Sequence, residues 1–202
     1  ADNYDFIGYA YFNYHLNNED SPTYASRGWK LNINGKYLVP VIKMEDGSRM
    51  GNSIVVRADL DGSIALGKKL SMKLGATVGT SLNGNEPPLS YRFFVGGQSH
   101  MKYFDNIISF DGLKFTQLYG DHIALAKISW QYNIYKNIYA IANFNGGYVS
   151  DNYNEWLTDD SFVFGCGLTL GMNTMAGPIE VSLMGSNRCS GLVGFLNVGY
   201  WF

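Results

Sequence analysis

The sequence has few charged residues and no long hydrophobic run. Charged residues make up 16% of the 202 residues, whereas a typical soluble domain has about 25%. A membrane-spanning helix needs about 20 consecutive apolar residues, but the longest uncharged stretches, such as 137–150, are interrupted by Asn and Gly. These absences exclude a helical membrane protein and set the chain apart from ordinary soluble domains.

The cysteine count and the net charge argue against two further kinds of function, zinc binding and nucleic-acid binding. The chain has two cysteines, Cys166 and Cys189, and no cysteine or histidine spacing typical of zinc sites. We therefore interpret both cysteines as small apolar residues. A net charge of −2 without any basic run disfavours nucleic-acid binding. The aromatic and aliphatic content excludes intrinsic disorder, and the length fits one domain.

The sequence is rich in glycine and aromatic residues, and they follow a period of two. It contains 24 Gly, 15 Tyr, 12 Phe and 4 Trp. From Phe162 to Met172, every even position is apolar, while the odd positions hold Val163, Thr169 and glycines. Such alternation predicts β-strands with one apolar face. It marks nine segments, at about 4–14, 28–39, 54–66, 70–78, 128–134, 137–148, 162–172, 178–186 and 191–202, and residues 91–97 are a candidate tenth.

The predicted strands are long enough to cross a membrane. Most have about 9–14 residues, and a strand tilted by about 45° crosses a bilayer in about 9–11 residues. Their polar faces hold Gly, Ser, Asn and Thr with isolated charges, which suits a polar lumen, while the apolar faces suit lipid. We therefore predict an all-β fold, an antiparallel transmembrane β-barrel with about 9–10 strands in this chain. A soluble β-sandwich or lipocalin-like barrel is the alternative.

The connections between the predicted strands alternate in length. Short links at 67–69, 135–137 and 173–177 alternate with longer ones at 40–52, 83–112, 149–160 and 187–190. Outer-membrane barrels have short periplasmic turns and longer external loops, so we expect the C-terminus on the periplasmic side. The last strand carries four residues on one face, Leu196, Val198, Tyr200 and Phe202. A closing strand that ends in Phe resembles the assembly signal of bacterial outer-membrane barrels.

Charged residues at inward-facing positions are the first candidate site. They are Arg57, Asp59, Asp61, Lys73, Lys127 and Glu180. Such residues can pair across neighbouring strands, and the pairs then hold the barrel shape or fix a loop in the lumen. The alternative is a permeation filter, because rings of charge set the selectivity of pores.

The long connection at 83–112 is the second candidate site. Its thirty residues are too many for a simple hairpin, and loops of this size are usually functional. A Pro-Pro pair stiffens its start, and Gly96 and Gly97 permit a tight reversal. We expect this segment to fold into the lumen as a plug, with Arg92, Gly96 and Gly97 among its candidate residues.

Five short motifs together resemble the barrels of the bacterial surface antigen superfamily, which includes BamA-like insertases and two-partner secretion transporters. They are NEDSPTYASRGW at 18–29, YRFFVGG at 91–97, FDGLKF at 110–115, GPIEV at 177–181 and NVGYWF at 197–202. The second, the third and the last are most similar to the barrel attached to bacterial patatin-like phospholipases. Insertases and secretion transporters follow the Gly-Gly with an Arg-Gly-aromatic tripeptide. This chain has Gln98, Ser99, His100 and Met101 there.

The resemblance implies a location in the outer membrane of a Gram-negative-type envelope, in contact with lipid and with the barrel assembly machinery. A complete barrel of this kind has about sixteen strands, an even number as is usual. The chain is then the C-terminal part of a longer protein, and we expect it to anchor, or to translocate material for, an attached patatin-like lipid hydrolase. The alternative is a self-standing small barrel that acts as a pore or as an adhesion or structural protein. Association into homo-oligomers stays open.

The chain contains no recognisable catalytic motif. Patatin chemistry needs a Gly-x-Ser-x-Gly nucleophile elbow, which this sequence lacks. We interpret three Asp-Gly pairs, at Asp46, Asp61 and Asp111, as turn or strand-end residues. The histidines His15, His100 and His122 are expected to be solvated, although a hydrolase embedded in the barrel would use His100 or His122. We therefore expect no enzyme activity, cofactor or metal in this chain.

Overall fold

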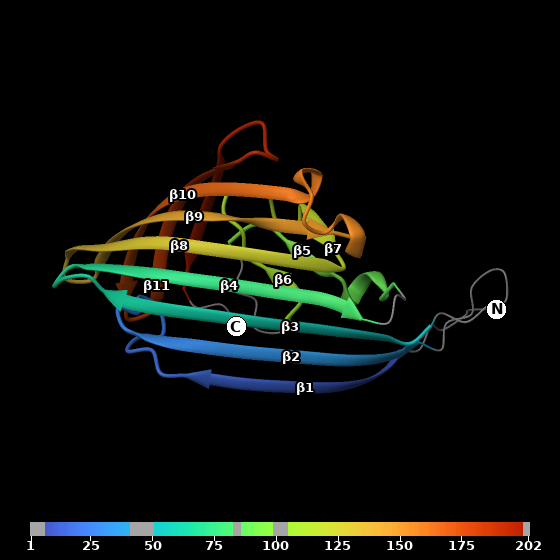
Figure 1. Cartoon of the computed structure of the whole chain (residues 1–202). Coiled ribbons are helices and arrows are strands. Elements are labelled where there is room, and N and C mark those ends of the chain that lie inside the picture. Colours follow the sequence, from blue (N-terminus) through green and yellow to red (C-terminus); the bar gives the residue numbers. More distant parts are fainter. Residues whose placement is uncertain (1–6, 41–50, 83–85, 99–104, 200–202) are drawn as a thin grey trace.

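The computed structural model describes residues 7–40, 51–82, 86–98 and 105–199. Nine long strands form one antiparallel sheet, ordered β1-β2-β3-β4-β8-β9-β10-β11-β12 (Figure 1). These wall strands are β1 Ile7–Asn17, β2 Gly28–Pro40, β3 Ser53–Ala65, β4 Leu70–Leu82, β8 His122–Tyr135, β9 Ile138–Ser150, β10 Phe162–Thr174, β11 Gly177–Ser186 and β12 Val193–Val198. The nine predicted strands are therefore present. Residues 4–6 of the first predicted strand lie outside the described residues, and β8 begins earlier than predicted.

The sheet is curved, and its edges are separate. Figure 1 shows the strands following one another around a common interior. In the described part of the chain, β1 and β12 each pair with one neighbour and not with each other. The shortest links, 66–69, 136–137 and 175–176, lie at one end of the strands, which we call the short-turn end. The connections 151–161 and 187–192 and the described ends of the other longer connections lie at the opposite long-loop end, which agrees with the predicted alternation; the connection 18–27 lies at the short-turn end and is also long.

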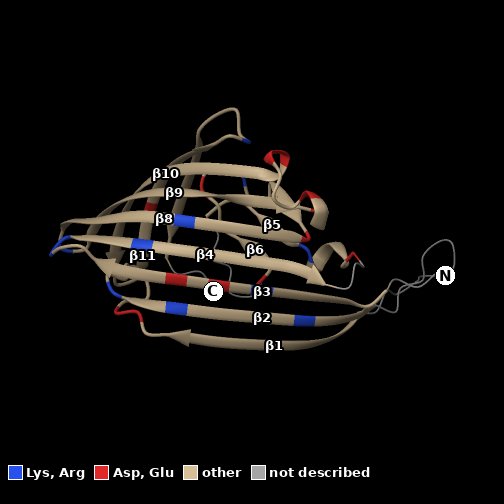
Figure 2. Ribbon diagram, in the orientation of Figure 1, with Lys and Arg blue, Asp and Glu red and all other residues tan. Residues whose placement is uncertain are grey.

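Alternating side chains place an apolar surface on the convex face of the sheet. Along β10, Leu168 and Leu170 are exposed by 68% and 56%, whereas the neighbouring Val163 and Thr169 are buried. The free Cys166 is also exposed on this strand. Figure 2 shows that most positions along the wall strands are uncharged. A continuous apolar band with a polar opposite face is the pattern of strands that contact lipid.

The described part of the connection between β4 and β8 lies against the concave face and contains a second, smaller sheet. We call its described residues, 86–98 and 105–121, the inner segment. It contains the 3-10 turn η1 Leu89–Tyr91 and the strands β5 Phe93–Val95, β6 Ile107–Ile108 and β7 Leu118–Gly120, ordered β6-β5-β7. No helix in the described ranges is long and apolar enough to cross a membrane.

Residues 91–97, the candidate tenth strand, do not join the wall, which has nine strands in the described part of the chain. Only β5 within them is extended, and it pairs inside the smaller sheet. Gly96 and Gly97, with φ values of 140° and 72°, turn the backbone immediately after β5. These are angles that favour glycine, and they stop the strand before it reaches the length of the wall strands. The connection also runs to Asp121, farther than the predicted loop end at Gly112.

A hydrophobic core lies between the inner segment and the wall near the long-loop end. The inner segment contributes Phe93, Val95, Ile108, Phe110 and Leu113, and the wall contributes Leu38, Val55, Ile123, Leu125 and Val163. Burial of each large side chain of this kind contributes about 1.5–3 kcal/mol. The inner segment is therefore a packed part of the fold.

Candidate functional site

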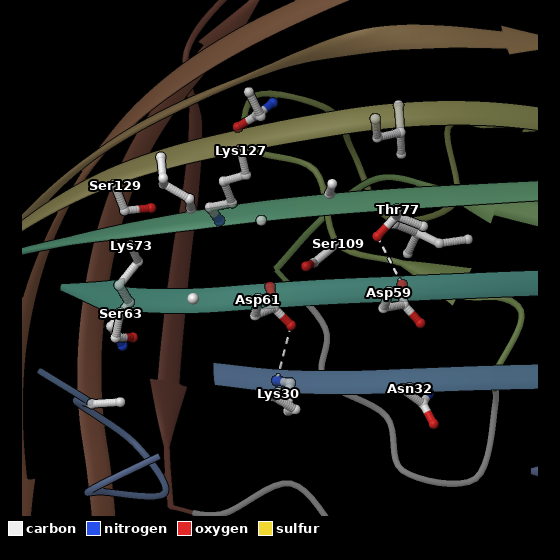
Figure 3. Close-up of a pocket in the computed structure, with 18 of the residues that line it drawn as sticks. Lys30, Asn32, Asp59, Asp61, Ser63, Lys73, Thr77, Ser109, Lys127 and Ser129 are labelled. Atoms are coloured by element: carbon white, nitrogen blue, oxygen red, sulfur yellow. Dashed lines mark hydrogen bonds and ion pairs between the residues drawn. The ribbon is translucent and has the colours of Figure 1, made fainter. Parts of the chain in front are cut away.

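A polar cavity of about 890 Å³ lies between the concave face, the inner segment and the β1–β2 connection (Figure 3). All six charged residues predicted to face inward line it: Arg57, Asp59, Asp61, Lys73, Lys127 and Glu180. They come from β3, β4, β8 and β11. Of these six residues, only Arg57 and Asp59 pair with each other, and they lie on the same strand.

The wall carries two ion pairs, one between neighbouring strands and one along a single strand. Lys30 and Asp61 are cross-strand partners on β2 and β3, and Lys30 Nζ lies 3.2 Å from Asp61 Oδ2. Arg57 and Asp59 share the inward face of β3, and Arg57 Nη2 lies 2.7 Å from Asp59 Oδ1. Thr77 Oγ1 on β4 donates to the same carboxylate oxygen at 2.7 Å (Figure 3). The Lys30–Asp61 pair is more exposed than the Arg57–Asp59 pair, so we expect it to contribute only about 0–1 kcal/mol.

The inner segment is anchored to the β2–β3 side of the sheet through Asp105. Its carboxylate pairs with Lys36 on β2, and its backbone carbonyl accepts a hydrogen bond from the Arg57 guanidinium on β3. Arg57 therefore contacts a wall carboxylate and the inner segment at once. A predicted interior charge thus lies where it can hold the inner segment in place.

The inner segment contacts the other side of the sheet, β8 to β11, through Asp111. The side chain of Asp111 is fully buried. Lys127 Nζ on β8 lies 2.8 Å from Asp111 Oδ2, and Gln98 Nε2 donates to Asp111 Oδ1 at 2.6 Å. Ser182 Oγ on β11 donates to Gln98 Oε1 at 2.9 Å and lies 2.7 Å from Thr169 Oγ1 on β10. We call these five residues the inner latch. It ties two points of the inner segment to three wall strands.

Glycine on the wall lets the inner segment lie directly on the backbone of β10 and β11. A Cβ at Gly165 would lie 2.0 Å from the carbonyl oxygen of Asp111. Gly112 has a φ of 89°, and a Cβ there would lie 2.2 Å from the carbonyl oxygen of Gly185. Ser186 Oγ donates to the Gly112 carbonyl at 2.7 Å. The glycine at position 165 of β10 therefore leaves the space in which Asp111 and Gly112 of the inner segment lie.

A polar and aromatic cluster closes the long-loop end, and Arg92 is its centre. Arg92 Nε lies 2.6 Å from an Asp121 carboxylate oxygen, and its Nη2 pairs with Asp151 after β9. Burial raises the pKa of the Asp121 carboxyl, and the Arg92 guanidinium opposes that rise. Arg92 therefore joins the inner segment to the ends of two wall strands, away from the cavity.

Two sequence-based interpretations are corrected by these positions. His122 is buried rather than solvated, because Thr80 Oγ1 lies 2.8 Å from its Nδ1 and the rings of Tyr153 and Trp156 pack beside it. Asp61 lies inside β3 and not at a turn or strand end. The Asp-Gly pair at Asp111 does lie in a turn, but its carboxylate is buried in the inner latch.

The remaining predicted residues lie elsewhere. Leu196 and Val198 are exposed on β12, by 65% and 71%, while His15 is exposed on β1. Six residues named in the sequence analysis lie outside the described residues: Asp46, Ser99, His100, Met101, Tyr200 and Phe202. Within the described ranges, no group of three His, Cys, Asp or Glu side chains is placed to hold a metal ion.

Sequence reasoning missed the partners that Arg57 and Lys127 find in the inner segment. Asp105, Asp111 and Gln98 lie in a connection whose path across the concave face cannot be read from periodicity. The available signal was an aspartate between Phe110 and a glycine, inside a motif already singled out by resemblance. An acidic residue in such an apolar setting needs a buried partner.

A family model described as the OMP85 superfamily matches residues 1–202, the whole chain. A search of curated proteins found no match to the chain.

Proposed function

The chain belongs to the OMP85 superfamily, and from this membership we propose that it forms part of an outer-membrane barrel wall whose lumen is filled by the inner segment. Members of this superfamily are outer-membrane β-barrel proteins. The apolar convex face and the polar concave face support the same placement. The observation that carries the proposal is the double attachment of the inner segment, through Asp105 to β2 and β3 and through the inner latch to β8, β10 and β11.

A lumen occupied in this way suits an anchor or a gated translocator better than an open pore. Permanent pores keep a water-filled interior, whereas here an apolar core and buried hydrogen bonds fix protein in that space. The proposed charge pairs serve this attachment: Arg57 and Lys127 hold the inner segment, and Asp59 holds Arg57. We therefore favour the interpretation that the interior charges fix the inner segment in the lumen. The alternative interpretation is that they form a permeation filter.

The finer proposal is that the barrel anchors, or translocates material for, an attached patatin-like lipid hydrolase. It is supported by the resemblance of the motifs at 91–97 and 110–115. It is also supported by Gln98, which occupies the region where insertases carry an Arg-Gly-aromatic tripeptide and instead binds Asp111. We expect the barrel assembly machinery to insert this barrel, with Leu196 and Val198 on the lipid-facing side of its last strand.

The test of this function is to sequence the coding region upstream of residue 1 and to assay outer-membrane fractions for lipid hydrolysis. We expect an upstream Gly-x-Ser-x-Gly, and we expect its Ser→Ala variant to remove membrane-bound hydrolase activity while the barrel still reaches the outer membrane. A signal peptide ending directly before residue 1 would contradict the proposal and favour a self-standing small barrel.

A further inference from the structure

The connection between β1 and β2, residues 18–27, crosses the short-turn end of the sheet instead of turning back tightly. Its base is closed by two hydrogen bonds, from the Asn18 amide to the Trp29 carbonyl and from the Trp29 amide to Asn18 Oδ1, at 3.0 and 2.6 Å. Asp20 accepts hydrogen bonds from the Ser26 hydroxyl and amide, and the hydroxyl contact lowers the pKa of the Asp20 carboxyl. The segment therefore has a fixed shape of its own.

The tip of this segment is received by the opposite part of the sheet. Tyr139, Gly171 and Glu180 are cross-strand partners on β9, β10 and β11, so they form one row across the concave face. The ring of Tyr24 stacks on Tyr139 with centroids 4.2 Å apart, and its hydroxyl donates to Glu180 Oε1 at 2.9 Å. Gly171 leaves the space between them, because a Cβ there would lie 2.4 Å from the Tyr24 oxygen.

Tyr139, Gly171 and Glu180 together form a site that holds the side chain of Tyr24, and we call this site the Tyr24 notch. Tyr24 is only 6% exposed although it lies in a connection between strands, and the adjacent Ala25 is 2% exposed. Burial and the Glu180 carboxylate raise the pKa of the Tyr24 phenol, so the phenol stays protonated and keeps its donor. Two further residues that line the cavity reach the connection: Gln131 Nε2 lies 3.3 Å from the Tyr24 carbonyl and Lys73 Nζ lies 3.4 Å from the Thr23 carbonyl.

The two attachments differ in strength. The inner segment is held by an apolar core and by ion pairs to Lys36 and Lys127, whereas residues 18–27 are held to the other strands of the sheet by one ring stack, one short hydrogen bond and three long ones. In the described residues, Lys73 forms no ion pair, so its contact with Thr23 is a single hydrogen bond to a neutral acceptor. A segment with so few anchors can open locally at a lower free energy than the laddered wall strands.

We propose that residues 18–27 are a strap that closes the cavity at the short-turn end, fastened by Tyr24 in its notch and releasable without unfolding the wall. The inner segment covers the cavity toward the long-loop end, and the strap covers it at the short-turn end. The inference does not depend on an attached hydrolase. It depends only on the contacts of Tyr24 and on the cavity behind them.

The test measures how fast a cysteine in the cavity reacts. Ser129→Cys introduces a thiol of similar size at a cavity position that is 5% exposed, in a protein whose Cys166 and Cys189 are replaced by Ala. The membrane-inserted protein is treated with a small membrane-impermeant maleimide. A thiol at Met175, which is fully exposed in the β10–β11 link, gives the reference rate for free access.

Tyr24→Phe removes the hydrogen bond to Glu180, and Gly171→Ala fills the notch from the wall side. Hydrogen bonds to charged groups shift equilibria by about tenfold to a hundredfold, so we expect each variant to speed labelling of Ser129→Cys at least tenfold. Matched controls are Tyr132→Phe, which removes a hydroxyl from an exposed tyrosine, and Gly62→Ala, where an added Cβ meets no atom within 4 Å. Both controls should label at the rate of the parent protein.

Three outcomes would overturn the strap. One is labelling of Ser129→Cys in the parent as fast as at Met175, which would mean that the cavity is already open. Another is an unchanged rate in Tyr24→Phe, a mild change that leaves the ring stack in place and so decides the matter if Gly171→Ala does not fold. The third is an equal acceleration in the controls, which would indicate general loosening of the wall.

Discussion

Replacing Asp111 by Ala is expected to detach the inner segment from β8 and β11 and to lower the free energy of unfolding by about 1.5–3 kcal/mol, which is the net contribution of hydrogen bonds to a charged group. The Lys127 side chain that remains is 35% exposed, so the variant leaves no fully buried charge behind. The variant leaves Lys127 without its carboxylate and Gln98 without its acceptor, so the contact of Gln98 with Ser182 also loses its support. Urea unfolding followed by tryptophan fluorescence measures the loss. Limited proteolysis between residues 86 and 121 measures the detachment.

The matched control is Asp61→Ala, which removes the carboxylate of the Lys30–Asp61 pair. Both pairs join a lysine to an aspartate on the same concave face, but the Asp61 side chain is 43% exposed and the Asp111 side chain is 0% exposed. We expect the control to change stability by less than about 1 kcal/mol. Equal losses in the two variants would mean that burial of Asp111 does not decide the effect.

Gly165→Ala should have a comparable effect from the wall side. The added Cβ would lie 2.0 Å from the Asp111 carbonyl oxygen and 3.1 Å from Asn145 Nδ2. Because the first of these neighbours is backbone, it cannot rotate away, and the inner segment must move. Overpacking in a tight site costs about 1–3 kcal/mol, and we expect the upper part of that range together with faster proteolysis of the inner segment.

Gly35→Ala provides the comparison for this variant, because no atom lies within 4 Å of its added Cβ. There the substitution should be neutral or slightly stabilising, since alanine reduces the conformational freedom of the unfolded chain. If Gly165→Ala left both stability and proteolysis at the level of Gly35→Ala, the close seat of the inner segment on β10 would be wrong.

The wall strands could be predicted from the sequence because each strand shows its own alternating pattern over neighbouring residues. A period of two places Leu168 outside and Thr169 inside, and exposure in the structure follows it residue by residue. The same alternation marks Asp59, Lys73 and Lys127 as inward-facing. Strand register then follows from short links such as 136–137, which leave neighbouring strands little freedom to slip.

The contents of the cavity could not be predicted in the same way, because they depend on contacts between residues distant in the sequence. Tyr24 meets Glu180 across 156 positions, and Gln98 meets Ser182 across 84. Strands as short as β7 carry too few residues to show a period. His122 was misjudged because its burial comes from Tyr153 and Trp156 in another connection. Resemblance named the segments that carry Tyr24 and Asp111, but it did not say what they touch.

The central claim, that the inner segment fills the lumen of an outer-membrane barrel, is tested most directly by ion conductance in planar bilayers. The protein with its native sequence should show little steady conductance, because the inner segment is attached on both sides of the sheet. Asp111→Ala should raise the conductance severalfold, while Asp61→Ala should leave it near the native level. A large steady conductance in the native protein, left unchanged by Asp111→Ala, would contradict the claim.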